Sequence, residues 1–101
     1  FGFGSRAEVP IIGKIANRTI SGQIDRLLVT DDEVFIVDYK TSHFVPENQQ
    51  GVPKSYLRQM ANYRDLISQI YPQRLVFCVL LWTSGPKWMN LSDAIINEAM
   101  T

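Results

Sequence analysis

The chain has 101 residues, enough for one domain or part of one, and 46% of them are hydrophobic, which excludes an intrinsically disordered chain. Ten basic and ten acidic side chains give a formal net charge of zero, so no overall positive field attracts nucleic acid or an anionic membrane. The longest apolar run, Leu75–Trp82, is much shorter than the ~20 residues that span a bilayer, so we expect no membrane partner.

Three extended segments open the chain: Glu8–Ile15, Thr19–Thr30 and Glu33–Thr41. The links between them, Ala16–Arg18 and Asp31-Asp32, are short and polar, which favours an antiparallel meander. The stretch that follows, residues 42–53, is rich in proline, asparagine and glutamine and has no periodicity. We expect an exposed, mobile loop there.

Apolar residues then recur at steps of three and four between Ser55 and Tyr71, which predicts an amphipathic helix that Pro72 ends. Leu75–Thr83 is a continuous apolar run typical of a buried strand, so the helix becomes a crossover between parallel strands. A short helix is expected over Leu91–Met100. The sequence therefore predicts an α/β fold with a mixed sheet: an antiparallel three-strand meander, a crossover helix, a fourth strand and a short C-terminal helix.

The register of the second and third segments follows from the turn between them. A loop centred on Asp31-Asp32 pairs residues whose numbers add up to a constant, which places Asp25 opposite Asp38 on one face of the sheet. Lys40 joins that face because it lies two positions beyond Asp38 on the same strand. The same count places Gln23 opposite Lys40.

Two carboxylates that face each other repel unless a positive charge lies between them. Mg2+ is the natural partner of Asp25 and Asp38, and Mn2+ is a second possibility, because both ions prefer hard oxygen ligands. With the ammonium of Lys40 beside the ion, the arrangement suggests metal-assisted phosphodiester hydrolysis. Charged residues on a solvated strand face are the ordinary alternative. The apolar run before Asp38 favours the catalytic interpretation, because ionisable groups are infrequent on interior strands.

Three motifs in order resemble those of RecB-family nucleases of the PD-(D/E)XK superfamily: Ile24-Asp25-Arg26 preceded by Gly22, Ile36–Thr41, and Gln59–Tyr63. The opening Ser5–Pro10 is more similar to the C-terminal nuclease domain of AddA-type helicase–nuclease subunits than to other members. The resemblance implies a restriction-endonuclease-like sheet.

It also implies roles for individual residues. Asp25 and Asp38 would bind the metal, with the backbone carbonyl of Tyr39 as a further ligand, and Lys40 would be the catalytic lysine. Glu8 matches an acidic position on the first strand of related nucleases, although a solvated glutamate at a strand end is equally plausible.

Gln59 and Tyr63 lie four residues apart on one helix face, where they would contact DNA or brace the active strand. The ordinary alternative is a polar boundary residue and a core tyrosine. Lys54 and Arg58, next to Gln59, are the candidates for phosphate contacts, and a solvated helix face explains them almost as well.

Two tryptophans and one histidine are further candidates for contacts with DNA. Trp82 belongs to an apolar strand and is expected in the core, whereas Trp88 is expected to be exposed and able to stack on an unpaired base. His43 follows the lysine motif and is expected to be a surface loop residue.

The chain opens on Phe1 instead of methionine, and we expect a partial nuclease domain whose upstream helix and motor regions are absent. Related nucleases carry a metal-binding histidine on that upstream helix, so we expect the isolated fragment to bind metal weakly and to cleave DNA poorly.

The resemblance implies that DNA is the substrate, as single strands from a broken duplex end that is processed for recombinational repair. The implied partners are a helicase part of the same polypeptide and an AddB-like second subunit. The implied address is the bacterial cytoplasm, which agrees with the lone cysteine, Cys78. Two alternatives remain open: a stand-alone exonuclease of phage or plasmid type, and a degenerate nuclease fold that serves as a DNA-binding or scaffolding module.

Overall fold

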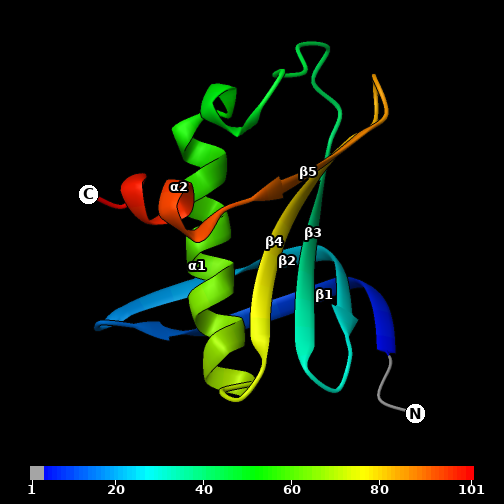
Figure 1. Ribbon diagram of the computed structural model, residues 1–101. Helices are drawn as coiled ribbons and strands as arrows, with labels where there is room; N and C mark the ends of the chain where they lie inside the picture. Colours follow the sequence, from blue (N-terminus) through cyan, green and yellow to red (C-terminus); the bar gives the residue numbers. More distant parts are fainter. Residues whose placement is uncertain (1–3) are drawn as a thin grey trace.

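The computed structural model describes residues 4–101, which form one mixed sheet with two α-helices (Figure 1). The elements follow in the order β1 (Gly4–Ile15), β2 (Arg18–Val29), β3 (Glu33–Lys40), a 3-10 turn η1 (Gln49–Gly51), α1 (Lys54–Ile70), β4 (Leu75–Trp82), β5 (Lys87–Leu91) and α2 (Asp93–Glu98).

The sheet has five strands in the order β1-β2-β3-β4-β5. β1, β2 and β3 are consecutive antiparallel neighbours, β4 pairs with β3 in parallel, and β5 returns antiparallel to β4. The parallel pairing requires a crossover, which α1 provides on one face of the sheet (Figure 1). The predicted α/β class, with its meander and crossover helix, is confirmed.

One strand was not predicted. β5 begins directly after the turn at residues 83–86 and pairs with β4, with Met89 and Leu91 buried and Trp88 and Asn90 exposed. This alternation is the pattern of a half-buried edge strand, but it covers only five residues. The sequence interpretation instead assigned Leu91 to the final helix, which begins at Asp93 after the cap residue Ser92.

The helix α1 begins one residue earlier than predicted and buries one face against the sheet: Leu57, Met60, Ala61, Tyr63, Leu66 and Ile67. Ile70, the last residue of the helix, is 61% exposed although it is apolar. α2 lies beside α1, where Nε of Arg58 donates to the carbonyl oxygen of Ala99 (3.0 Å; Figure 1). Neither helix within residues 4–101 is long and apolar enough to cross a bilayer.

The first two strands change face at their middle. Glu8 has φ 53°, a left-handed conformation that side chains avoid, and the ladder between β1 and β2 skips Glu8 and Asp25. In β2, Ile24 before the break and Leu27 after it are both buried in the core. Because Ile24 and Leu27 are an odd number of residues apart, a regular strand could not bury both on one side. The break at Asp25 therefore lets both residues pack into the same core.

The two-residue turn between β1 and β2 consists of Ala16 and Asn17, both with positive φ (49° and 70°). This geometry suits the right-handed twist of a hairpin. Arg18, expected in the turn, is the first residue of β2.

The stretch predicted as a mobile loop, residues 42–53, is mostly exposed but is tied to the β4–β5 hairpin. The ammonium of Lys87 donates to the carbonyl oxygens of Pro46 (3.0 Å) and Glu47 (2.6 Å), and the hydroxyl of Ser84 donates to the carbonyl of Ser42. The loop is thus held at both its start and its middle.

Candidate active site

The predicted register of β2 and β3 is confirmed next to their turn. Val29 pairs with Val34, and the ladder continues to Arg26 and Val37. The two residue numbers in each pair have the same sum, which is the register that the turn predicts. Asp25 and Asp38 are the next two residues along the strands, and the carboxyl of Asp25 is close enough to act on that of Asp38. The ladder ends there, so Gln23 is not paired with Lys40, contrary to the sequence count.

Lys40 and Asp38 lie two residues apart on β3, and their side chains are in contact. Nζ of Lys40 lies 2.5 Å from Oδ2 of Asp38, and both side chains are largely buried. The same Nζ lies 4.0 Å from the centre of the Tyr56 ring, which comes from the first turn of α1. Two aspartates and a lysine therefore share one face of β2 and β3, under the N-terminal end of α1.

Asp38 is the one buried charged residue of the described chain, 7% exposed. Burial raises the pKa of Asp38 above its ordinary value of 3.8, because the charged carboxylate loses its hydration. Contact with Lys40 lowers that pKa, and the neighbouring Asp25 raises it further. The net shift is upward, so this environment favours the neutral acid unless a further positive charge arrives.

Tyr39, between the two catalytic candidates of β3, is fixed from two sides. Its backbone N–H donates to Oδ2 of Asp25 (2.8 Å), which orients that carboxylate. On the opposite face of the sheet, its hydroxyl accepts from Nε of Arg26 (3.1 Å), whose Nη1 donates to Oγ of Ser5 (2.7 Å). The segment that carries the expected carbonyl ligand is therefore linked to β2 through both backbone and side chain.

Gln59 and Tyr63 contact each other and the sheet. Nε2 of Gln59 donates to the Tyr63 hydroxyl (3.3 Å), which donates to the carbonyl of Gln23 (3.3 Å). A side chain at Gly22 would place its Cβ 2.5 Å from that hydroxyl, so glycine permits the close approach. Of the two roles considered for this pair, the geometry is that of a brace on β2, two residues before Asp25.

The other sequence-predicted residues lie around this centre. Glu8 occupies the register position opposite Asp25 on β1 and is exposed. Lys54 and Arg58 are exposed on α1, although Nε of Arg58 is engaged with α2. Trp82 is buried (1% exposed) and Trp88 is half exposed (51%), as expected, and His43 is an exposed loop residue.

Two participants were missed from the sequence. Tyr56 lies within the predicted amphipathic helix, yet its ring faces the ammonium of Lys40. Arg26 was noted only as part of a motif, yet it bonds Tyr39 across the sheet. The sequence signal for Arg26 is its position in the register, which places it beside the third strand. The helix period gives no such signal for Tyr56, because a tyrosine that packs in the core and one that contacts a cation occupy the same positions.

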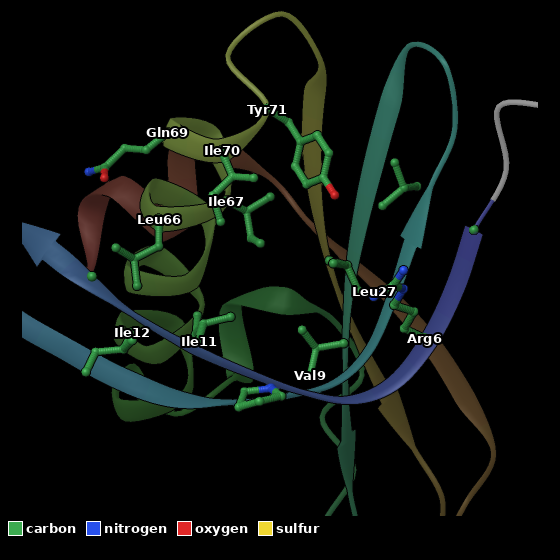
Figure 2. A pocket seen from close by; sticks show the side chains of 14 residues that line it. Arg6, Val9, Ile11, Ile12, Leu27, Leu66, Ile67, Gln69, Ile70 and Tyr71 are labelled. Carbon is green, nitrogen blue, oxygen red and sulfur yellow. The ribbon is translucent and has the colours of Figure 1, made fainter.

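A cavity of about 640 Å³ is separate from these residues (Figure 2). It lies between β1 and the C-terminal half of α1 and is lined mainly by apolar side chains, including Ile11, Leu27 and Leu66, with Arg6 and Gln69 at its edges. Neither aspartate nor Lys40 lines it. A smaller cleft of about 360 Å³ is lined by Ser55, Arg58, Gln59, Asn62 and Tyr63 of α1 with Ile20 and Ser21 of β2, next to the brace on β2.

The aspartate pair suits a divalent cation. Oδ2 of Asp38 is buried, and its close neighbour is the ammonium of Lys40. Burial beside the second carboxyl of Asp25 makes the charged form of Asp38 costly, and a hard cation offsets that cost. Within the part of the chain that the structure describes, no third His, Cys, Asp or Glu joins the pair to form a metal-binding cluster.

The mixed sheet with an α1 crossover, carrying two aspartates and a lysine on its middle strands, defines an α/β protein of the restriction-endonuclease-like class. The sequence matches the profile of the PD-(D/E)XK nuclease superfamily over residues 1–88, and the chain belongs to that superfamily, whose members are nucleases. A search of curated proteins found no match.

Proposed function

We propose that this chain carries the site of a RecB-family nuclease that hydrolyses DNA phosphodiester bonds with a divalent metal, Mg2+ or Mn2+. One observation carries the proposal: Asp25, Asp38 and Lys40 converge on one face of the sheet, where the Asp38 carboxyl is buried beside a second carboxyl. Superfamily membership supports the reaction class, since PD-(D/E)XK nucleases generally use divalent metals.

Asp25 and Asp38 would hold the ion, with the carbonyl of Tyr39 as a further ligand. When bound, the ion supplies Lewis-acid chemistry: it lowers the pKa of water and neutralises charge on the phosphate. The hydrogen bond from the Tyr39 N–H fixes the Asp25 carboxylate in advance. Lys40 would hold its positive charge beside the phosphoryl oxygens, where charge develops in the transition state.

The substrate would run past the N-terminal half of α1. Lys54 and Arg58 are exposed there, and Arg58 and Gln59 line the smaller cleft with further polar groups. Hydrogen bonds and charge contacts of this kind position a nucleic-acid backbone without reading its sequence. Lys54, Arg58 and Gln59 are therefore the proposed DNA contacts, and Tyr63 is proposed to keep β2 in place.

The larger assembly is proposed from the motif resemblance. The opening Ser5–Pro10 and the motif spacing favour an AddA-type helicase–nuclease, in which residues 1–101 are part of the nuclease domain. A helicase region of the same polypeptide and an AddB-like subunit would deliver single strands from broken DNA ends for recombinational repair. The buried free thiol of Cys78 is compatible with a bacterial cytoplasm.

Metal binding can be tested without cleavage. We expect Mg2+ or Mn2+ to raise the melting temperature of the complete protein's nuclease domain, because a ligand at about 100 times its Kd stabilises the folded state by about 2.7 kcal/mol. The shift should disappear in Asp25→Asn and Asp38→Asn and persist in Asp32→Asn, an exposed aspartate in the neighbouring turn. Equal shifts in all four proteins would contradict the proposed metal site.

Cleavage is the second test. In the complete protein, Asp38→Ala and Lys40→Ala should each reduce Mg2+-dependent degradation of DNA by at least about a hundredfold, the scale on which preorganised charge contributes to rate. Lys14→Ala removes an exposed charge from β1 and should leave the rate unchanged. ATP-driven unwinding, where the protein has it, should persist in all three. Persistent degradation in both site variants would show that these residues are not the catalytic ones.

The alternative is a degenerate nuclease fold that serves as a DNA-binding or scaffolding module. Such a module would bind DNA without carboxylate-dependent binding of Mg2+ or Mn2+. The melting experiment therefore separates it from a nuclease.

A further inference from the structure

Lys40 has two neighbours that act on its charge. Its Nζ lies 2.5 Å from Oδ2 of Asp38 and 4.0 Å from the centre of the Tyr56 ring, and only 16% of its side chain is exposed. An aromatic face attracts a cation through its quadrupole, most strongly where water is excluded. The ring differs from the carboxylate because it neither takes a proton from the ammonium nor binds a hard metal ion.

Tyr56 is itself held in place from two directions. Its backbone N–H donates to the carbonyl of Pro53 (3.0 Å) in the first turn of α1. Its ring packs on that of Trp82, with centroids 6.2 Å apart and planes tilted by 45°. Trp82 is buried, and it is the direct partner of Lys40 in the parallel ladder between β3 and β4.

These contacts close a triangle between the helix and two strands. Lys40 and Trp82 are neighbours across the sheet, and Tyr56 lies on both of them. The ring therefore gives the ammonium a second contact beside the Asp38 carboxylate. A long, flexible lysine side chain without such a surface would follow the carboxylate alone.

We infer that Tyr56 is the positioning residue of Lys40: its ring face, backed by Trp82, holds the ammonium at the site. This inference rests on the proposed function for its catalytic consequence, but the contact itself can be measured separately. A phenyl ring serves equally well, because the tyrosine hydroxyl takes no part in the contact, whereas an aliphatic side chain does not.

The kinetic test compares Tyr56→Phe with Tyr56→Leu in the complete protein. We expect Tyr56→Phe to retain kcat within about twofold, and Tyr56→Leu to lose about tenfold in kcat with KM little changed, a loss equivalent to about 1.4 kcal/mol. The matched control is Tyr71→Leu. Tyr71 also faces a cation, Arg74 (4.9 Å), but at the other end of α1, and its loss should not change kcat.

The spectroscopic test uses nuclear magnetic resonance with lysine labelled at Cε. Ring current from Tyr56 should shift the Lys40 methylene protons upfield of those of the exposed Lys14 and Lys54, with the Lys40→Arg variant assigning the signal. The shift should persist in Tyr56→Phe and vanish in Tyr56→Leu. The dispersion of the protein's methyl proton signals reports whether the Tyr56→Leu variant stays folded.

The outcomes separate the inference from the proposed function. Absence of the upfield shift in the unsubstituted protein overturns the inference, whatever the activity. A lost shift in a folded Tyr56→Leu protein with unchanged kcat also overturns it. If the protein cleaves no DNA, the proposed function fails, and the shift alone then decides whether Tyr56 positions Lys40.

Discussion

Asp38 is held where its own charge is unfavourable. Burial and the neighbouring Asp25 raise its pKa, and the single ammonium of Lys40 does not compensate fully. Ionisable groups with such shifts collect at functional sites, where their environment is arranged for a ligand or a reaction instead of for stability. A divalent ion would remove the penalty, because it favours the charged carboxylate.

This electrostatic cost predicts a pH-dependent effect of Asp38→Asn. Because the folded-state pKa of Asp38 is raised, its stabilising contribution is complete below the unfolded value near 3.8 and is lost as pH rises through the folded pKa. The asparagine variant does not titrate. In chelator-treated buffer, it should therefore be more stable than the unsubstituted protein at pH 7, with the difference shrinking toward pH 3.8.

Thermal or urea unfolding at several pH values measures this difference. Asp32→Asn, an exposed position, should show no comparable trend. A variant Asp38→Asn that is less stable than the parent at pH 7 would mean that the Lys40 contact outweighs burial, contrary to the direction of the pKa shift.

At the scale of elements, the contact between β2 and α1 sets the position of the Asp25 strand. Tyr63 is 4% exposed, and its hydroxyl donates a hydrogen bond to the carbonyl of Gln23, the residue after Gly22. The helix approaches this closely only because residue 22 lacks a side chain. The same element, α1, contributes Tyr56 at its first turn, so one helix places both the strand of Asp25 and the ammonium of Lys40.

Gly22→Ala should therefore destabilise the fold by about 1–3 kcal/mol, the usual cost of overpacking a well-filled site. The new Cβ would lie 2.5 Å from the Tyr63 hydroxyl and 2.9 Å from Cε1 of that ring, which is buried and cannot move away easily. Gly4→Ala is the matched control, because nothing lies within 4 Å of a Cβ there. Denaturant midpoints of the two variants would measure the effect, and equal midpoints would rule out the close packing.

At the scale of the whole molecule, the site exists because distant segments meet at the middle strands of one sheet. Asp25 comes from β2, Asp38 and Lys40 from β3, Tyr56 from α1, and Trp82 from β4. β3 carries the lysine motif between an antiparallel and a parallel neighbour, so both of its edges are paired. The interior of the sheet is buried as well. Cys78, on the adjacent strand β4, is buried, and this burial raises the pKa of its thiol to about 12.

The sequence alone determined the features that depend on short spacing. Alternation and polar links predicted the meander, steps of three and four predicted the helix, and the turn at Asp31-Asp32 fixed the register of the nearest residue pairs, which placed the two aspartates together. These predictions succeed because each depends on neighbours a few residues away, whose geometry the backbone period dictates.

Only the tertiary structure decided the rest. The β2–β3 ladder ends next to the irregular position at Glu8 and Asp25. The register predicted from the turn is therefore correct at Arg26 but wrong at Gln23, which does not pair with Lys40. The contact of Tyr56 with Lys40 joins residues from different elements, and no period in the sequence records it. The physical reason is that packing against α1 bends and breaks the strands where burial is gained, and such long-range contacts outweigh local regularity.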